Sequence, residues 1–216
     1  MAINFNPIIV FDFETTGKYW QTAEITEIAA RAYDSRTLEP LSNSEFCTLV
    51  KPITPLDQLP KEADEALTIT GITREELEKA PDAKTVWNQF ISYVNRFNRK
   101  KDEWNSPIAA GSNIEGYDLL ICDRYNELFG PKKKDTILFN TFKKIDLMKI
   151  LFFWFEDNNE LKNFKQETLR EYFGWNSEGL HRAMSDVDFT AALIFRFMKF
   201  HRNTSARTSF KNCFKK

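Results

Sequence analysis

The sequence predicts an α/β fold in which helices cover a mixed β-sheet. Two observations support this fold class. Short apolar segments with the spacing of strands come first along the chain, and helical segments then alternate with further short apolar segments. Such an order is typical of a sheet with helices packed on its faces. No internal repeat or low-complexity tract points to a different architecture.

The first three strands are expected to follow one another as a meander. We expect them at residues 7–11, 26–33 and 46–50. The first is an apolar run followed by the acidic residues Asp12 and Glu14 and the turn-forming Gly17, a pattern typical of a buried strand that ends at a polar site. Residues 52–72 are rich in proline and acidic side chains, so we expect a connection with short turns there.

Four helices are expected from the spacing of apolar residues. They cover residues 81–97, 117–128, 165–173 and 184–200. The first has a proline near its start, and the second is followed by Gly130 and Pro131, which commonly end helices. Between these two helices, residues 107–110 are expected to form a short buried strand that stops at a glycine. A further apolar segment around Ile145 leads into the aromatic residues 152–155.

Length and composition exclude several classes of protein. The chain has 216 residues, of which 42% are hydrophobic and 28% charged, so it is neither disordered nor collagen-like. Its longest apolar runs are far shorter than the about 20 residues needed to cross a membrane, and its N-terminus lacks a signal-peptide pattern. We therefore expect an intracellular, cytoplasmic protein with no membrane partner. Three cysteines without C-x-x-C spacing argue against a disulfide framework and a zinc site.

Charge is unevenly distributed along the chain. The net charge is −1, but residues 199–216 hold six Lys or Arg and no acid, which leaves 24 basic and 31 acidic residues elsewhere. We expect residues 199–216 to form a basic C-terminal tail on an acidic body. Phenylalanines alternate with the basic residues, so the tail either helps to bind a polyanion or is a solvated extension.

Asp12 and Glu14 are the first residues whose pattern indicates chemistry. Alternate residues of a strand point to the same face, so both carboxylates should project together while Phe13 points into the core. Neighbouring anions repel each other, and a cation between them removes that repulsion. Oxygen-only ligands favour Mg²⁺ or Mn²⁺ as the cation. The alternative is a solvated acidic strand end.

Three motifs occur in a fixed order along the chain. They are D-x-E-T-T-G at residues 12–17, S-N-I-E-G-Y-D at residues 112–118 and H-R-A-M-S-D at residues 181–186. Together they resemble the motifs of the DEDD exonuclease superfamily, specifically its DnaQ-like DEDDh branch of 3′-to-5′ exonucleases. The likeness extends from about residue 7 to residue 198, so we expect a DnaQ-like exonuclease domain at residues 1–198.

The second motif departs from the common pattern of the family. That pattern is H-N-x-x-F-D, whereas Ser112 replaces the histidine here and three residues separate Asn113 from Tyr117. This longer spacing is closer to that of TREX-type exonucleases.

The resemblance implies a ribonuclease H-like fold, with a central mixed five-stranded sheet flanked by helices. It also implies four catalytic ligands for two divalent cations, Mg²⁺ or Mn²⁺. These ligands are Asp12, Glu14, Asp118 and Asp186. Two cations would neutralise their charge of about −4 and stabilise the attacking and leaving oxygens of phosphodiester cleavage. Asp188 competes with Asp186, but the two point in different directions on a helix, and the H-x4-D spacing selects Asp186.

The resemblance further implies that His181 is the general base. An imidazole can take a proton from water at neutral pH. The alternative role for His181 is that of an ordinary surface or core residue. The second histidine, His201, lies in the basic tail and has no acidic neighbour in the sequence to orient it.

The resemblance also implies residues that hold the terminal nucleotide. They are Thr15, Thr16, Ile69, Asn113 and Tyr117. The threonines could instead form a plain turn, and Ile69 could be an ordinary core residue. The implied activity is hydrolysis of terminal phosphodiester bonds of single-stranded or frayed DNA, with release of nucleoside 5′-monophosphates. Trimming of RNA 3′ ends, and a non-catalytic nucleic-acid-binding or polymerase-associated subunit, are the alternatives.

Overall fold

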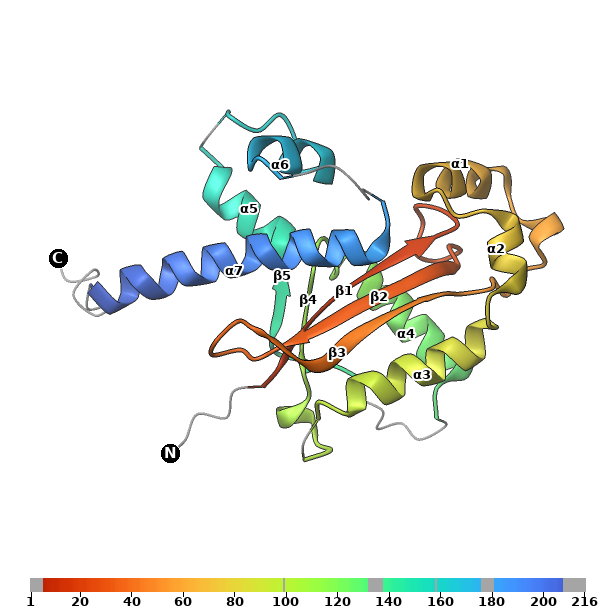
Figure 1. The fold of residues 1–216 in the computed structure, drawn as a ribbon, viewed down its shortest axis with the longest axis horizontal. Coiled ribbons are helices and arrows are strands. Elements are labelled where there is room, and N and C mark those ends of the chain that lie inside the picture. Colours follow the sequence, from red (N-terminus) through yellow and green to blue (C-terminus); the bar gives the residue numbers. More distant parts are fainter. Residues whose placement is uncertain (1–5, 99, 132–137, 158, 176–180, 208–216) are drawn as a thin grey trace.

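A mixed five-stranded sheet lies at the centre of the protein. The computed structural model describes residues 6–98, 100–131, 138–157, 159–175 and 181–207. The strands are β1 (Ile8–Thr15), β2 (Ile25–Tyr33), β3 (Pro40–Leu49), β4 (Ile108–Gly111) and β5 (Lys144–Asp146). They are ordered β3-β2-β1-β4-β5 (Figure 1), with β2 antiparallel to β1 and β3, and β4 parallel to β1 and β5. The mixed five-stranded sheet predicted from the sequence is therefore confirmed.

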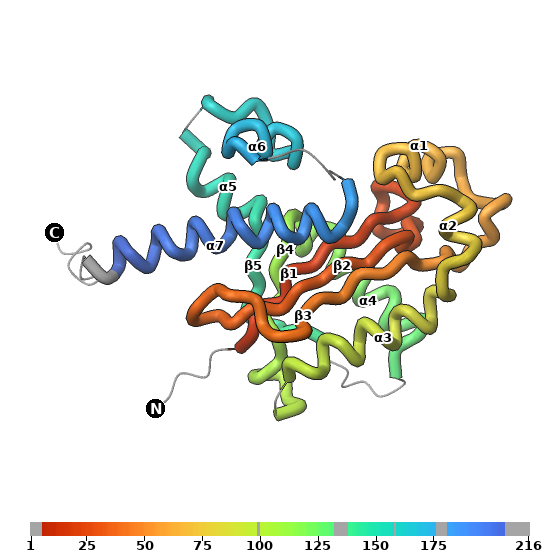
Figure 2. Tube along the Cα trace, viewed as in Figure 1, coloured from red at the N-terminus to blue at the C-terminus, as the bar shows by residue number. Residues whose placement is uncertain are grey.

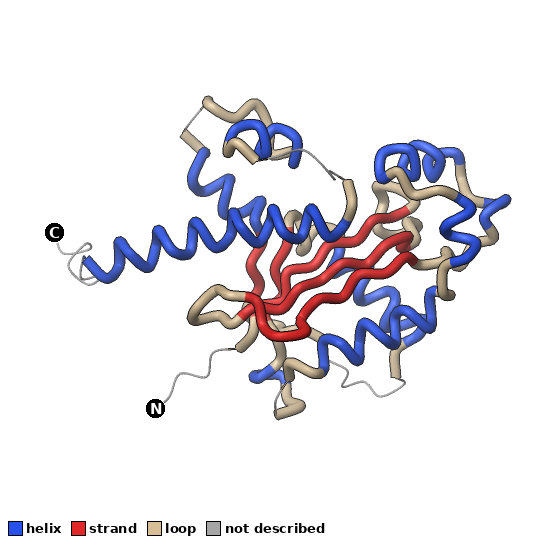
Figure 3. Tube along the Cα trace, in the orientation of Figure 1, coloured by secondary structure: helices blue, strands red, loops and turns tan. Residues whose placement is uncertain are grey.

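Helices cover both faces of the sheet (Figure 3). They are α1 (Lys61–Thr70), α2 (Arg74–Lys79), α3 (Ala83–Asn95), α4 (Asp118–Phe129), α5 (Leu147–Phe155), α6 (Gln166–Tyr172) and α7 (Ala183–Arg207), with single 3₁₀ turns at η1 (Leu56–Gln58) and η2 (Glu103–Asn105). On one face α7 contacts β1, β2 and β4 and packs beside α5, whereas α3 contacts β3 and α4 on the other. In the described part of the chain, we find no helix with the length and apolarity to cross a membrane.

The two faces of β1 belong to two separate hydrophobic cores. Its odd-numbered residues up to Phe13 pack in the core that includes α3 and α4. Its even-numbered residues Ile8 and Val10 pack in the core that includes α5 and α7. Asp12 and Glu14 continue this second row, because alternate residues of a strand share a face. Both carboxylates therefore project on the side of the sheet that α7 covers.

The prediction that residues 52–72 form only a connection with short turns is wrong, because α1 lies within them. Pro60 precedes this helix, and Gly71 ends it in a left-handed conformation with φ 68°. Ala63 and Leu67 are one turn apart and buried, so packing supports the helix in a segment where proline and acidic residues suggested turns.

The C-terminal helix is longer than the predicted helix at residues 184–200. Residues 199–207, the first part of the predicted basic tail, belong to α7, whose C-terminal end extends past the edge of the sheet (Figure 2). Phe200 contacts Trp154 of α5, with ring centroids 5.2 Å apart. Residues 208–216 lie outside the described residues, so the role expected of the tail stays a prediction.

Candidate active site

Three carboxylates from two elements meet on the face of the sheet that α7 covers. Asp12 and Glu14 project from β1, and Asp186 lies in the first turn of α7. Each offers an oxygen, and these oxygens lie within 4.8 Å of one another. A set of carboxylate oxygens so close together fits a hard divalent cation such as Mg²⁺ or Mn²⁺.

Asp118, the fourth predicted ligand, lies next to this group and is hydrogen-bonded to the backbone of β1. It is the first residue of α4 and is 4% exposed. Its Oδ1 accepts a hydrogen bond from the backbone N–H of Phe13 at 3.2 Å, and its charge acts on Asp12. The structure therefore brings three of the four predicted ligands into one cluster and holds the fourth against the strand that carries two of them.

Burial and mutual repulsion make these carboxyls weak acids in the absence of a cation. The pKa of Asp12 is raised well above its ordinary value by burial and then by the charges of Asp118 and Glu14. Burial, followed by the charge of Asp186, raises the pKa of Glu14 to about 8. Burial also raises the pKa of Asp118 to about 8. A bound cation would favour the ionised carboxylates and release their protons.

This electrostatic arrangement predicts that the cation-free protein loses stability as the pH rises. Glu14 and Asp118 ionise near pH 4 to 4.5 in an unfolded chain but only near pH 8 in the folded protein. Between these limits the folded state binds more protons, so the free energy of unfolding falls as the pH increases towards 8. Thermal unfolding in a chelator from pH 5 to 8.5 should show this decline, and added Mn²⁺ should raise the melting temperature most at the upper end.

The control for this prediction is Glu14→Gln, which removes one of the ionising groups. Its melting temperature in chelator should fall less steeply with pH than that of the unchanged protein. Identical slopes for the two proteins would contradict the assignment of a raised pKa to Glu14.

His181 lies just before α7 and close to the carboxylates. A hydrogen bond from its backbone reaches Asp186, and its half-buried ring places Nε2 3.4 Å from Oε1 of Glu167 on α6. Its φ is 64°, a left-handed conformation that is uncommon outside glycine and that recurs at functional sites. Asp188, the alternative to Asp186, is not part of the carboxylate cluster and forms an ion pair with Arg31 of β2.

A hydroxyl network joins two of the predicted substrate-binding residues. The hydroxyls of Thr15 and Tyr117 are hydrogen-bonded to each other at 2.7 Å, and both lie within hydrogen-bond distance of the carbonyl oxygen of Gly17. Thr16 is buried, and its N–H and hydroxyl form hydrogen bonds with the backbone of Glu24. These hydrogen bonds fix the turn after β1. Thr15 and Tyr117 lie there beside Glu14, a carboxylate of β1.

The other two predicted substrate-binding residues lie in different surroundings. Ile69, on α1, is 59% exposed and so is not an ordinary core residue. Asn113 follows β4 with φ 59°, and its backbone N–H donates to Oδ1 of Asp146 at 2.9 Å. Asp146 also accepts from the backbone of Glu115 and caps α5 through Met148, so it orders the loop that forms the second motif.

Sequence reasoning missed two buried charged residues beside the site. Glu27 of β2 is 3% exposed and accepts hydrogen bonds from the side chain of Arg182 at 2.9 Å and the backbone of Ala183 at 3.1 Å. Glu27 thereby fixes the start of α7. In the sheet, Glu27 lies opposite Glu14 of β1. Arg170 of α6 is fully buried and pairs with Asp186 at 2.8 Å. For Glu27, an acid among the isoleucine and alanine residues in the first half of the strand was the available signal.

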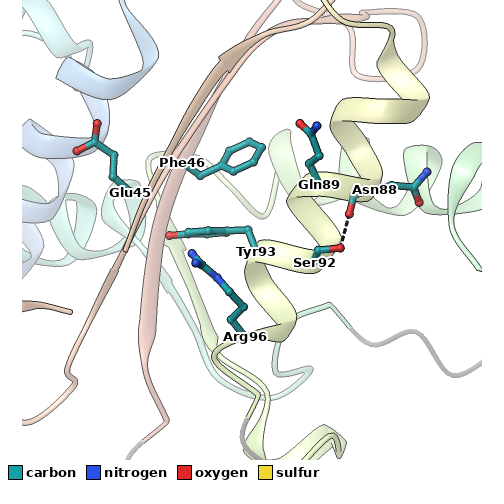
Figure 4. A pocket seen from close by; sticks show the side chains of 7 residues that line it. All are labelled: Glu45, Phe46, Asn88, Gln89, Ser92, Tyr93 and Arg96. Carbon is teal, nitrogen blue, oxygen red and sulfur yellow. Dashed lines mark hydrogen bonds between the residues drawn. The ribbon is translucent and has the colours of Figure 1, made fainter. Parts of the chain in front are cut away.

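The surface cleft drawn in Figure 4 is a separate feature. It lies between β3 and α3 and is lined by Glu45, Phe46, Asn88, Gln89, Ser92, Tyr93 and Arg96. None of these residues was predicted to act in catalysis or binding. The group of acids that could hold a cation is the carboxylate cluster under α7, and none of its residues lines this cleft.

Comparison with protein families agrees with the fold and the motifs. The model of the exonuclease family RNase_T matches residues 9–194. The chain therefore belongs to this exonuclease family, and the DEDD-superfamily, DnaQ-like exonuclease predicted from the three motifs is confirmed. The likeness of the second motif to TREX-type enzymes stays a prediction.

Two DNA polymerase III proteins are similar to this chain in sequence. Subunit epsilon of Aquifex aeolicus (strain VF5) is 24% identical over 191 residues, which cover 88% of this chain and 80% of that protein. The PolC-type DNA polymerase III of Caldanaerobacter subterraneus subsp. tengcongensis is also 24% identical over 191 residues, but these cover 11% of its length.

Solved structures of exonuclease I share the fold. One has a TM-score of 0.71 at 20% identity and matches 91% of this chain and 44% of its own. Exonuclease I of E. coli in complex with a dT13 oligonucleotide has a TM-score of 0.70 at 21% identity, with 87% and 40% covered. Its zinc-bound complex with single-stranded DNA has a TM-score of 0.68 at 20% identity, with 92% and 44% covered. The chain spans less than half of exonuclease I, and the predicted ribonuclease H-like fold is confirmed.

Proposed function

We propose that this protein removes nucleotides one at a time from the 3′ end of single-stranded or frayed DNA and releases nucleoside 5′-monophosphates. The observation that carries the proposal is the cluster of Asp12, Glu14 and Asp186, whose oxygens lie within 4.8 Å of one another in a chain of the exonuclease family. Such a cluster suits the binding of divalent cations, for which Mg²⁺ or Mn²⁺ is the expected choice.

Each residue of the site has a role in this proposal. Asp12, Glu14, Asp118 and Asp186 hold two divalent cations, which when bound stabilise the attacking and leaving oxygens of the phosphodiester. His181 takes a proton from the attacking water. The turn after β1 orients the 3′-terminal nucleotide through Thr15, Thr16 and Tyr117, while Asn113 lines the site and exposed Ile69 contacts the terminal base.

DNA is the favoured substrate because the similar proteins act in that context. One relative is a DNA polymerase III subunit, and a structural neighbour was crystallised with a dT13 oligonucleotide. The same five catalytic residues could trim RNA, so RNA is an outcome to be tested. A non-catalytic nucleic-acid-binding subunit is less consistent with the convergence of three acids on one point.

Four labelled oligonucleotides test the proposal directly. Single-stranded DNA and RNA, each labelled at either the 5′ or the 3′ end, are incubated with the protein in Mg²⁺ or Mn²⁺. A 3′-to-5′ exonuclease converts 5′-labelled strands into a descending ladder and releases the 3′ label at once as a mononucleotide. We expect the DNA to be degraded faster than the RNA.

A 3′-terminal phosphorothioate and a chelator are the controls for this assay, since each should suppress the ladder. Faster loss of RNA would replace DNA by RNA as the substrate. A ladder from the 5′ end, or no cleavage with either cation, would contradict the proposed activity.

A further inference from the structure

A buried arginine contacts one of the expected cation ligands. Arg170 of α6 is 0% exposed, and its Nη2 donates to Oδ1 of Asp186 at 2.8 Å. The same nitrogen lies 3.0 Å from the carbonyl and 3.2 Å from the hydroxyl of Ser185, and the guanidinium lies over the ring of Phe189 at 4.7 Å. Burying an unpaired guanidinium costs free energy, so the ion pair between Arg170 and Asp186 is a structural part of the fold.

We propose that Arg170 is a positioning residue that orients Asp186 for a divalent cation. A carboxylate has two oxygens, and Arg170 holds one of them from the α6 side. An oxygen of Asp186 also lies within 4.8 Å of oxygens of Asp12 and Glu14 in the carboxylate cluster. Hydrogen-bonded partners behind a metal ligand set its direction in this way. This inference rests on the proposed function of the cluster.

Helix α7, which carries Asp186, also contributes to a second ion pair that is more exposed than the Arg170–Asp186 pair. Asp188, two residues after Asp186, pairs with Arg31 of β2, and Arg31 also pairs with Glu45 at 2.6 Å. The side chains of Arg31 and Asp188 are 24% and 40% exposed, whereas those of Arg170 and Asp186 are 0% and 4% exposed. Arg31, on β2, is thus a matched arginine, because it pairs with an acid of α7 that lies outside the carboxylate cluster.

Arg170 has two opposing effects on a cation, and their balance decides the outcome. Its positive charge repels the cation, and this effect alone would make removal of Arg170 tighten cation binding. Its hydrogen bond fixes the direction of Asp186, and loss of such a partner typically lowers metal affinity about 10-fold to 100-fold. We expect orientation to dominate, because the guanidinium is fully buried and is held by Ser185 and Phe189 as well as by Asp186.

The test is Mn²⁺ binding by the full chain without nucleic acid, followed by titration calorimetry or electron paramagnetic resonance. Arg170→Met should weaken the affinity for Mn²⁺ about 10-fold to 100-fold, and Arg31→Met should leave it unchanged. Arg170→Lys keeps the charge but not the planar fork, so its affinity should lie between those of Arg170→Met and the unchanged protein. Asp186→Asn should weaken binding, and adding Arg170→Met to it should cause little further loss.

The outcomes separate this inference from the proposed function. Unchanged or tighter Mn²⁺ binding by Arg170→Met overturns the positioning role. If Arg170→Met does not fold, Arg170→Lys decides, and unchanged affinity in that variant overturns the role. If Asp186→Asn itself leaves Mn²⁺ binding unchanged, the cation site is wrongly assigned, and the proposed function fails together with this inference.

Discussion

Replacing Asp12 by alanine should lower the rate of nucleic acid hydrolysis by several orders of magnitude while the protein remains folded. Asp12 lies at the centre of the acidic group, and its charge interacts with those of Glu14, Asp118 and Asp186. Loss of this ligand would disorder the cations that the proposed reaction requires. Asp186→Ala should have a similar effect, since Asp186 supplies the ligand from α7.

The stability of these variants provides an independent check. Removal of one buried, repelling carboxylate should preserve the melting temperature of the cation-free Asp12→Ala protein or raise it. The loss of activity would then not be due to unfolding. Asp188→Ala is the matched control for Asp186→Ala, because it removes an acid from the same helix that pairs with Arg31 outside the cluster. Near-normal turnover by Asp12→Ala would contradict the assignment of the site.

The part of the site on β1 could be predicted from local rules. The period of two along a strand is enough to put Asp12 and Glu14 on one face and Phe13 in the opposite core, as the structure has them. The choice of Asp186 over Asp188 needed the spacing to His181 as well. The H-x4-D spacing is informative because it places Asp186 in the first turn of α7, with His181 just before the helix.

The buried charges behind the ligands could not be predicted in this way. Arg170 meets Asp186 only because α6 packs on the start of α7, and Glu27 meets Arg182 across 155 positions of the chain. Such pairs depend on the docking of elements, which neither helical periodicity nor local propensity determines. Helix α1 was missed for a related reason, since its buried Ala63 and Leu67 outweigh the turn signals around them.

His181→Ala should lower the rate of hydrolysis by about 10² to 10⁴ while Mn²⁺ binding stays nearly intact. The side chain is not among the three clustered oxygen ligands, but its backbone contacts Asp186, so it lies close to the cations without being needed to hold them. In the unchanged protein at saturating Mn²⁺, where the carboxylates stay ionised, the rate should fall at low pH, because a protonated imidazole cannot accept a proton from water. In His181→Ala this part of the pH profile should be lost.

His201→Ala is the matched control, because the chain has two histidines and His201 lies on the exposed part of α7. Its rate at saturating substrate and its pH profile should equal those of the unchanged protein. If His181→Ala retains the original pH profile, the base must be another group, such as hydroxide formed on the cation. A large loss of Mn²⁺ affinity in His181→Ala would instead indicate that this residue helps to form the cation site, because a base that acts only on water leaves the ligands in place.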